Sequence, residues 1–589
     1  MAESTATSKA TPPATHKEIV DAISTVNTKA EPAANYKETV ESILVAFILA
    51  FIFRAFVVEA FVIPTGSMAP TLYGAHMRLR CPDCGYSFDI GYRGKQSEDN
   101  DDVDIPSEIT VPIHYHCPNC GYEFPKVDPA GKALTLPVRF GDRILVLKYL
   151  YLFQKPVRWD VVVFKSPWEP THHVAEDPLY EQNFIKRLVG IGPESLVILD
   201  GDVYTGPLDA NEPVDANGRQ LFHIQRKIEY AQSAVWRTIY DNDFIPHLGA
   251  QRHPWTQPWR EETPLSGWKL SSAPTSDWPA GAPSRAFSFA NIKQQSAIQF
   301  DADANADSTH ALTDYLTYDE LEHSSGWQPV NVSDLKLCCD YTRQAGDGPL
   351  RLQLSKNADL FTAEFTRGKV KLLKGRRVDP NSPAVSNQKM VGVPAGATEA
   401  AEIEVPALAG PGPARLELIN VDYRVSVRIN GKEVLHTTDA YYTPDVQALW
   451  KQEQDALSGS RTEPGPFARS LVRIEAGGQQ ALVEHLSLAR DIYYLTRRTD
   501  RFWASVDSIS HLKDGEYFVL GDNSFISGDA RYWHDPIELP HEDLFVDSGR
   551  VPERFMLGKA FFVYWPAGYR LPWIPVNAVP DFGEMRFIH

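Results

Sequence analysis

The stretch "NFIKRLVGI", Asn183–Ile191, has the pattern of a buried β-strand that carries a lysine among apolar residues. An unperturbed lysine has a pKa of about 10.4 and is charged at neutral pH. Burial among apolar side chains disfavours the ammonium form and lowers this pKa. The stretch therefore predicts a strand, and it leaves two interpretations of Lys186: a strand lysine that reaches solvent, or a buried neutral base.

A Gly-Ser-Met turn between two prolines is the second feature, and it lies in "FVIPTGSMAPTL", Phe61–Leu72. A serine hydroxyl is a weak nucleophile that needs a base within hydrogen-bonding reach. No histidine and aspartate follow Ser67 at a familiar spacing, so Lys186 is the candidate base. The alternative is a turn serine without a catalytic role.

The most apolar run of the chain, "ILVAFILAFIFRAFVV", precedes this turn at Ile43–Val58. It is interrupted only by Arg54, whose long side chain can reach a membrane interface. A tilted membrane helix needs roughly 17–20 mainly apolar residues. We therefore predict a transmembrane helix over residues 42–60, with a buried core helix as the alternative. The polar residues 1–41 are interpreted as a leader, either a flexible tail or a docking segment.

Two cysteine knuckles follow, "CPDCG" at Cys81–Gly85 and "CPNCG" at Cys117–Gly121. Two cysteines separated by two residues present both thiolates to one tetrahedral metal ion. The pattern predicts a zinc-ribbon-like insert over residues 81–130, with a structural zinc because no coordination position stays open. The predicted ligands are Cys81, Cys84, Cys117 and Cys120. One or two disulfides are the alternative if the segment lies in an oxidising compartment.

A long β-rich stretch occupies residues 205–505. In "ARLELINVDYRVSVRINGKEVLH" apolar and polar residues alternate, and Asn430-Gly431 is a strong hairpin turn. From about residue 284 we expect an antiparallel β-sandwich with some likeness to lectin-like jelly rolls. Exposed aromatic residues leave two roles open: binding of a carbohydrate or cell-wall polymer, or a spacer or substrate-gating domain.

Charge and length limit the remaining possibilities. The net charge is −18, which makes duplex nucleic acid an unexpected partner. A chain of 589 residues has room for about two to four domains.

Five motifs occur in a fixed order after the apolar run: "FVIPTGSMAPTL", "GDRILVLKYLY", "RWDVVVFKSP", "FIKRLVGI" and "GDNSFISGDARYWHDP". Together they resemble the bacterial type I signal peptidase family, membrane-bound Ser/Lys endopeptidases that remove signal peptides from exported proteins. The resemblance covers roughly Ile43–Leu79, Arg139–Asp202 and His511–Pro566.

This resemblance implies roles for individual residues. Ser67 would be the acylating nucleophile and Lys186 its general base. The backbone N–H of Ser67 and the hydroxyl of Thr65 would form the oxyanion hole, and Ser527 would orient the lysine amine. Asp529 and Arg531 would form an ion pair beside the site. Residues expected to shape the supporting turn are Gly521, Asp522 and Asn523. Residues expected to line shallow pockets for small side chains at positions −1 and −3 are Phe61, Ile63, Met68, Leu72, Phe184 and Ile185.

The expected fold is mainly β, with a signal-peptidase-type antiparallel catalytic core, one N-terminal transmembrane helix and two inserts. The segments expected along the chain are a cytoplasmic polar leader (1–41), a transmembrane helix (42–60), the first core segment (61–80), the zinc-ribbon-like insert (81–130), the second core segment (131–204), the β-rich insert (205–505) and the third core segment (506–589).

The resemblance implies a single-pass protein of the bacterial cytoplasmic membrane, with its catalytic domain on the extracytoplasmic side. Its partners would be signal peptides of preproteins and membrane lipid, and catalysis would need no cofactor. A soluble Ser/Lys self-cleaving repressor shares the chemistry, but the apolar helix and the lack of a DNA-binding module disfavour it. The alternative from another class is a membrane-anchored binding protein whose degenerate peptidase core presents the β-sandwich.

Overall fold

The computed structural model describes residues 36–92, 96–97, 100–103, 105–110, 115–127, 130–167, 183–246, 255–263, 266–269, 285–320, 329–377, 396–410, 412–458, 469–496, 502–539, 544–568 and 579–589. The predicted leader lies outside the described residues up to residue 35. The chain divides into two compact units, Met1–Glu59 and Ala60–His589.

The first unit contains helix α2 (Tyr36–Phe56). Uncharged apolar side chains of this helix are about half exposed, among them Leu44 at 58% and Leu49 at 60%. Within the described residues, none of the helices combines the length and apolar character that crossing a bilayer requires. The predicted transmembrane helix is therefore not confirmed.

The predicted end of that helix at residue 60 is wrong, because strand β1 begins at Val58 and runs to Val62. Its sequence, "VEAFV", carries β-branched and aromatic side chains that favour an extended backbone.

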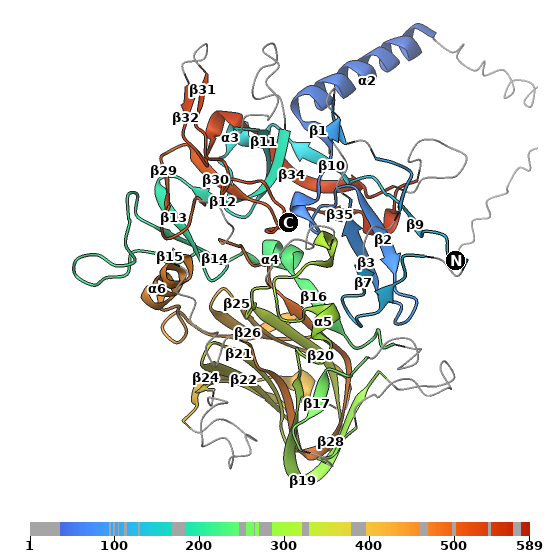
Figure 1. Cartoon of the computed structure of the whole chain (residues 1–589), viewed down its shortest axis with the longest axis vertical. Coiled ribbons are helices and arrows are strands. Elements are labelled where there is room, and N and C mark those ends of the chain that lie inside the picture. The colour runs from blue at the N-terminus through green and yellow to red at the C-terminus, as the bar shows by residue number, and fades with distance from the viewer. Residues whose placement is uncertain are drawn as a thin grey trace, which may run out of the picture. The chain divides into compact units, whose positions relative to one another are not determined.

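The main sheet of the second unit confirms the predicted mainly β, antiparallel character. Its strands follow the order β1-β10-β34-β11-β12-β30-β33, and β35 pairs with β34. The bounds are β10 (Arg143–Leu147), β34 (Met556–Trp565), β11 (Val161–Lys165), β12 (Asn183–Ile191), β30 (Glu516–Leu520), β33 (Val551–Pro552) and β35 (Arg586–Phe587). Figure 1 shows early strands, in blue and cyan, side by side with late ones in red.

Strand β12 is the link between these distant segments. It pairs with β11 on one side and with β30 on the other, where Arg187 lies opposite Leu520. The apolar residues Leu188 and Val189 are fully buried, as expected for a central strand covered on both faces. The loop that follows β30 is thereby brought next to Lys186.

A smaller sheet of four strands adjoins β12 and has the order β15-β14-β13-β29. Its strands are β13 (Glu194–Leu199), β14 (Asp202–Gly206), β15 (His223–Ile224) and β29 (Ser510–Leu512). The boundary predicted at residue 205 therefore falls inside a strand, because β14 extends to Gly206 and β15 pairs back onto it.

The cysteine segment is built from short hairpins with a small core of their own. Strands β2 (His76–Arg80) and β3 (Ser87–Gly91) flank the first knuckle, and β7 (Tyr115–His116) and β8 (Glu123–Phe124) flank the second. Strand β6 (Glu108–Thr110) pairs with β9 (Thr135–Pro137), beyond the end predicted at residue 130. The four cysteines pack in this core with Met77, Phe88 and Tyr115.

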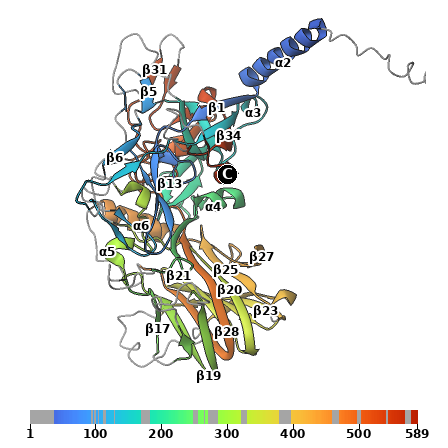
Figure 2. The ribbon, with the colours of Figure 1, turned by 90° about the vertical axis from the view of Figure 1, so that its right-hand side faces the viewer.

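The β-rich insert forms a sheet of thirteen strands that divides into two layers. The long strand β28 (Val472–Arg490) pairs with β21 along its first half and with β20 along its second. Strands β21 and β25 then contact each other across the core without pairing, as in a sandwich. Figure 2 shows these strands running alongside one another.

The strands of the two layers are β20 (Leu335–Gly346), β21 (Leu350–Lys356), β22 (Asp359–Thr366), β23 (Lys369–Arg376), β24 (Thr398–Glu404), β25 (Ala414–Val421), β26 (Arg424–Ile429) and β27 (Lys432–His436). The strands β16 (Arg237–Asp241), β17 (Trp259–Glu261), β18 (Trp268–Lys269) and β19 (Phe287–Phe300) complete the sheet. The hairpin predicted at Asn430-Gly431 is present, with φ of 50° and 78°.

The sandwich begins earlier than the predicted residue 284, because β16, β17 and β18 belong to its sheet. These strands are two to five residues long, too short to show a clear alternation in the sequence.

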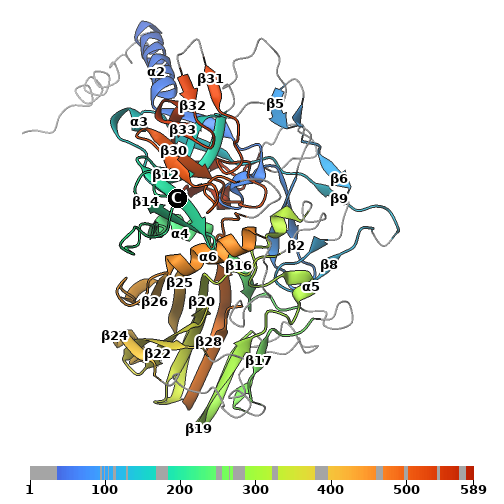
Figure 3. The same cartoon turned by 60° about the vertical axis from the view of Figure 1, so that its left-hand side comes forward.

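The described residues of the second unit also form short α-helices: α3 (Leu150–Phe153), α4 (Glu229–Val235), α5 (Ala306–Thr309) and α6 (Val446–Leu457). Helix α6 packs against β13 of the small sheet, and Trp450 of this helix lies in the core of the sandwich. Figure 3 shows α6, in orange, beside the sandwich strands β20 and β25. The small sheet and the sandwich are thus directly in contact.

A buried ion pair joins β12 to the loop after β30. Arg187 donates from Nε and Nη2 to the carboxylate of Asp522 at 2.7 and 2.6 Å, and both side chains are fully buried. Burial alone would raise the pKa of Asp522, but the charge and hydrogen bonds of Arg187 hold it below its usual value.

We expect Asp522→Ala to lower the free energy of unfolding by about 3–5 kcal/mol, because it leaves the Arg187 charge buried and unpaired. The urea midpoint measures this loss. The pKa of Asp522 is lower in the folded than in the unfolded protein. The ion pair therefore stabilises the fold fully above the unfolded pKa of about 3.9, and this stabilisation is lost as the pH falls through the lower, folded pKa. Asp514→Ala is the control, because that side chain is 78% exposed. Equal effects of the two substitutions would contradict the expectation.

Candidate active site

Ser67 lies in a short 3-10 helix, η1 (Gly66–Met68), which is stabilised by backbone hydrogen bonds between neighbouring residues. The N–H of Ala69 donates to the carbonyl of Gly66, and that of Leu72 donates to the carbonyl of Met68, both at 2.9 Å. Thr65, just before the turn, has an extended backbone and an exposed side chain. The turn therefore presents its serine between two extended segments.

The serine and the lysine singled out in the sequence are in contact. Lys186 Nζ donates a hydrogen bond to Ser67 Oγ at 2.7 Å, although the residues are 119 positions apart. Ser67 is 8% exposed and Lys186 is 5% exposed. Of the two interpretations of Lys186, the structure supports the buried one.

The surroundings of Lys186 favour its uncharged form. Burial lowers the pKa of Lys186 from 10.5 to about 8, because the ammonium form loses its hydration. The charges of Asp529 and Asp522 raise this pKa and that of Arg531 lowers it. A substantial fraction of the amine is thus neutral near pH 8 and can accept a proton.

The loop after β30 holds the Ser67 turn from the other side. The backbone N–H of Asn523 donates to the carbonyl of Ser67 at 3.0 Å, and its side-chain amide donates to the carbonyl of Gly66 at 3.3 Å. A Cβ at Gly521 would lie 2.4 Å from the Ser67 carbonyl oxygen, so only glycine allows this approach.

Ser527 lies beside the dyad but does not orient the lysine through a hydrogen bond. A Cβ at Gly521 would also lie 2.2 Å from Ser527 Oγ. The Ser527 hydroxyl and the Ser67 carbonyl oxygen therefore both lie against Gly521. Within the described residues the buried Ser527 Oγ has no hydrogen-bond partner.

The ion pair expected beside the site is present. Arg531 donates to Asp529 from Nε and from Nη2, both at 2.8 Å, and both side chains are fully buried. Asp529 also accepts from the backbone N–H of Gly521 at 2.9 Å, which ties the pair to the turn behind Ser67.

The residues expected to line substrate pockets lie in two core clusters. Ile63, Met68 and Leu72 are almost fully buried in one cluster, with Phe61 and Ile185 partly buried at its edge. Phe184 belongs to the second cluster and packs against Trp533, with ring centroids 6.3 Å apart. Only the partly buried members present surface in this structure.

Two residues of the β-rich insert reach the site and were missed in the sequence. Tyr318 and Asp319 belong to the 3-10 turn η3 (Thr317–Asp319), and Asp319 Oδ1 accepts from the side-chain amide of Asn523 at 2.7 Å. Neither residue stands in a motif or a periodic segment, so nothing in the sequence near them could have indicated the contact.

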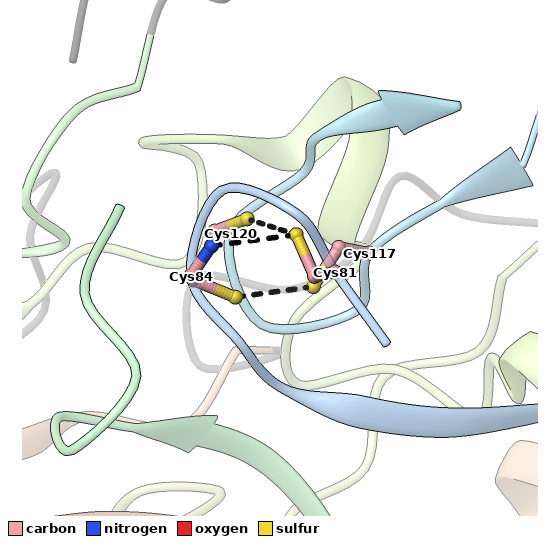
Figure 4. A group of neighbouring side chains, drawn as sticks. All are labelled: Cys81, Cys84, Cys117 and Cys120. Atoms are coloured by element: carbon pink, nitrogen blue, oxygen red, sulfur yellow. Dashed lines mark hydrogen bonds between the residues drawn. The ribbon is translucent and has the colours of Figure 1, made fainter. Parts of the chain in front are cut away.

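The four predicted cysteine ligands converge on one point (Figure 4). The Sγ atoms of Cys81 and Cys120 are 3.7 Å apart, and those of Cys84 and Cys117 are 3.6 Å apart. All four are buried and none is in a disulfide. A Zn–S bond of about 2.3 Å gives about 3.8 Å between sulfurs of a tetrahedral site. The cluster can therefore hold a metal ion.

A second cluster, of buried carboxylates, was also missed. It consists of Asp202, Asp334, Asp422 and Asp491. Lys227 Nζ lies 2.5 Å from Asp422 and 2.9 Å from Asp491, and Lys356 Nζ lies 2.5 Å from Asp334. Two lysines already supply positive charge here, so the cluster is best described as an ionic link between the small sheet and the sandwich.

Two solved structures illustrate the likenesses found, and both are weak. A carbohydrate binding module from Bacillus subtilis is 12% identical and covers 38% of this chain and 95% of its own, with a TM-score of 0.20. A β-glucanase from Bacillus licheniformis is 7% identical and covers 41% and 95%, with a TM-score of 0.21.

Curated relatives are closer in sequence. Signal peptidase I of Pseudomonas aeruginosa is 33% identical over 129 residues, which are 22% of this chain and 38% of the relative. Signal peptidase I of Pseudomonas fluorescens is 38% identical over 96 residues, 16% and 30% of the two chains. The chain thus spans well under half the length of these relatives.

The family comparison covers more of the chain. Residues 36–87, 127–242 and 423–565 match the family described as signal peptidase, peptidase S26. These ranges make up more than half of the 589 residues and contain both Ser67 and Lys186. With that extent of agreement, the chain belongs to the signal peptidase family, peptidase S26.

Proposed function

We propose that the protein is a membrane-bound serine endopeptidase that removes N-terminal signal peptides from exported preproteins. Ser67 is the nucleophile and Lys186 the general base. The observation that carries the proposal is the 2.7 Å contact between Lys186 Nζ and Ser67 Oγ, made by two buried side chains. A degenerate core that only presents the sandwich would not need this contact, so the structure favours the enzyme over the binding protein.

The chemistry follows from a neutral amine beside a hydroxyl. Lys186 Nζ takes the proton of Ser67 as Oγ attacks the scissile carbonyl carbon. The ammonium then returns the proton to the leaving amine as the C–N bond breaks, which leaves an acyl-enzyme. Lys186 next takes a proton from water, and the hydroxide attacks the ester carbonyl. The proton passes to Ser67 Oγ, which releases the signal peptide as an acid.

The negative charge that develops on the carbonyl oxygen needs donors. The Ser67 N–H and the exposed Thr65 hydroxyl are the proposed oxyanion hole, and such a donor typically contributes about 10²–10³ in rate. Of the six residues expected to line substrate pockets, the partly buried Phe61, Ile185 and Phe184 are proposed to contact the small residues at −1 and −3.

Membrane anchoring is proposed for α2. Between Ser42 and Phe53 its sequence has no charged residue, and side chains such as Phe47 are 59% exposed. An exposed apolar surface of this kind favours contact with lipid. By family resemblance we propose a bacterial cytoplasmic membrane location with the catalytic domain outside. A carbohydrate or cell-wall ligand of the sandwich stays a prediction.

We further propose that the four-cysteine cluster holds one structural zinc ion. The donor set is four thiolates, and the sulfur separations of 3.6 and 3.7 Å suit a tetrahedral ion better than a disulfide bond of about 2.05 Å. Backbone N–H groups of Cys84 and Tyr86 donate to the Sγ atoms of Cys81 and Cys84, both at 3.5 Å, and such bonds stabilise thiolates.

We expect Ser67→Ala and Lys186→Met each to lower kcat/KM for a model preprotein by about a thousandfold or more, because each removes one partner of the proton transfer. Cleavage is followed by gel shift of the precursor, and urea midpoints report folding. Ser195→Ala is the matched control, since it removes another fully buried serine hydroxyl from the same unit. Near-normal cleavage by either dyad variant would reject the assignment.

The pH dependence follows from the pKa of Lys186. Only the neutral amine is a base, so kcat/KM should rise with pH and reach half its plateau at about pH 8. Initial rates between about pH 6 and about pH 9.5 measure this profile. Rates that stay level across this range would show that Lys186 does not control the reaction.

Metal analysis of the purified protein should find about one zinc per chain. Removal by a chelator, or Cys84→Ser, should lower the thermal unfolding temperature because the hairpins lose their common ligand. Cys338→Ser is the control, since Cys338 is a buried thiol of the sandwich strand β20. Metal-free protein whose four knuckle cysteines resist alkylation until reduced would favour disulfides.

A further inference from the structure

We propose that the turn η3 of the β-rich insert is a structural component of the active site. Tyr318 and Asp319 are positioning residues that hold the Gly66–Met68 turn, and thereby keep Ser67 Oγ within reach of Lys186 Nζ. The inference rests on the proposed function in taking Ser67 as the nucleophile. It assigns the insert a role in the reaction that a spacer would not have.

Tyr318 packs directly on the backbone of the catalytic turn. A Cβ built at Gly66 would lie 2.2 Å from Tyr318 Cε1, and one built at Gly91 would lie 2.5 Å from the same atom. The ring therefore fills the space between η1 and strand β3, and a side chain at either glycine would displace it. Tyr318 is 4% exposed, and its hydroxyl donates to the carbonyl of Ala75 at 3.4 Å.

Asp319 acts on the same turn through Asn523. Its carboxylate accepts from Asn523 Nδ2 at 2.7 Å, and that amide also donates to the Gly66 carbonyl at 3.3 Å. The carboxylate oxygen of Asp319 is the acceptor in this contact, so the NH₂ group of Asn523 faces it. In this orientation the side-chain amide of Asn523 also donates to the Gly66 carbonyl, and the backbone N–H of Asn523 donates to the Ser67 carbonyl.

Hydrogen bonds from the sandwich fix the segment that leads into η3. Arg490, at the end of β28, donates from Nη2 to the carbonyls of Asp314 and Tyr315, both at 2.8 Å, just before η3. Arg490 is 4% exposed, so these bonds are shielded from water. A continuous set of contacts thus leads from the long strand β28 through η3 to the Ser67 turn.

Loss of these η3 contacts would change the position of Ser67 Oγ more than the binding of the preprotein. Attack requires Ser67 Oγ to stay close to both the amine and the scissile carbonyl, and a displacement of about 1 Å can cost about a hundredfold in rate. Loss of the η3 contacts frees one side of the turn while β12 and its lysine stay in place. We therefore expect kcat to fall and KM to change little.

The test uses the full-length chain with Tyr318→Ala and Asp319→Ala. Each should lower kcat for a model preprotein by about tenfold to a hundredfold with KM changed less than about threefold. Asp319→Asn should recover most of the lost kcat, because its amide oxygen still accepts from Asn523, and Tyr318→Phe should do the same because it keeps the ring. The rate of Ser67 labelling by a serine-acylating reagent, followed by intact mass, should fall in parallel with kcat.

The matched control is Tyr341→Ala, which removes a ring that is also 4% exposed but belongs to sandwich strand β20. If Tyr341→Ala lowers kcat as much as Tyr318→Ala, or if both alanine variants at η3 keep wild-type kcat, the inference is overturned. A wild-type chain labelled at Ser67 that cleaves no preprotein refutes the proposed function, whereas the labelling rates of the variants still decide the inference. A chain that neither cleaves nor becomes labelled overturns both.

Discussion

Exclusion of water from one amine is the constraint on which the arrangement depends. Lys186 lies on a central strand, and its burial brings its pKa to about 8. Without that burial the lysine would stay charged and could not act as the base that we propose for Ser67. The amine extends from the main sheet, contacts the Ser67 turn, and is influenced by the charges of Asp522, Asp529 and Arg531 in the loop after β30. Hydrogen bonds between the loop after β30 and the Ser67 turn, and the ion pair between that loop and β12, hold these three segments together.

Burying the amine brings other charges into the interior, and the structure pairs them across distant segments. Arg187 and Asp522 join β12 to the loop after β30, and Asp529 and Arg531 pair with each other within that loop. Lys356 of the sandwich strand β21 lies 3.5 Å from Asp202 of β14 and so links the sandwich to the small sheet. A buried ion pair contributes little net stability, but breaking it is costly, so such pairs specify one arrangement.

The β-rich insert is therefore more than an appendage of the peptidase core. Its turn η3 contacts the Ser67 turn, and Arg490 of β28 anchors the segment before η3. Asn119 of the second cysteine knuckle hydrogen-bonds to the backbone of Asp241 and Phe244. The contacts with the Ser67 turn thus come from η3, and the hydrogen bonds from Arg490 tie the segment just before η3 to the sheet of the insert. The cysteine hairpins complete this support through β3 and Tyr318.

Sequence patterns were sufficient to predict those features that depend on residues close together in the chain. The alternation of the strands, the Asn430-Gly431 turn, the paired cysteines and the ordered motifs around Ser67 and Lys186 could all be read from the chain, because each depends on residues close in sequence. The end of α2, the early start of the sandwich and the contacts of Tyr318 and Asp319 could not. Those depend on which distant segments become neighbours, and only the pairing of strands such as β12 with β30 and β28 with β21 decides that.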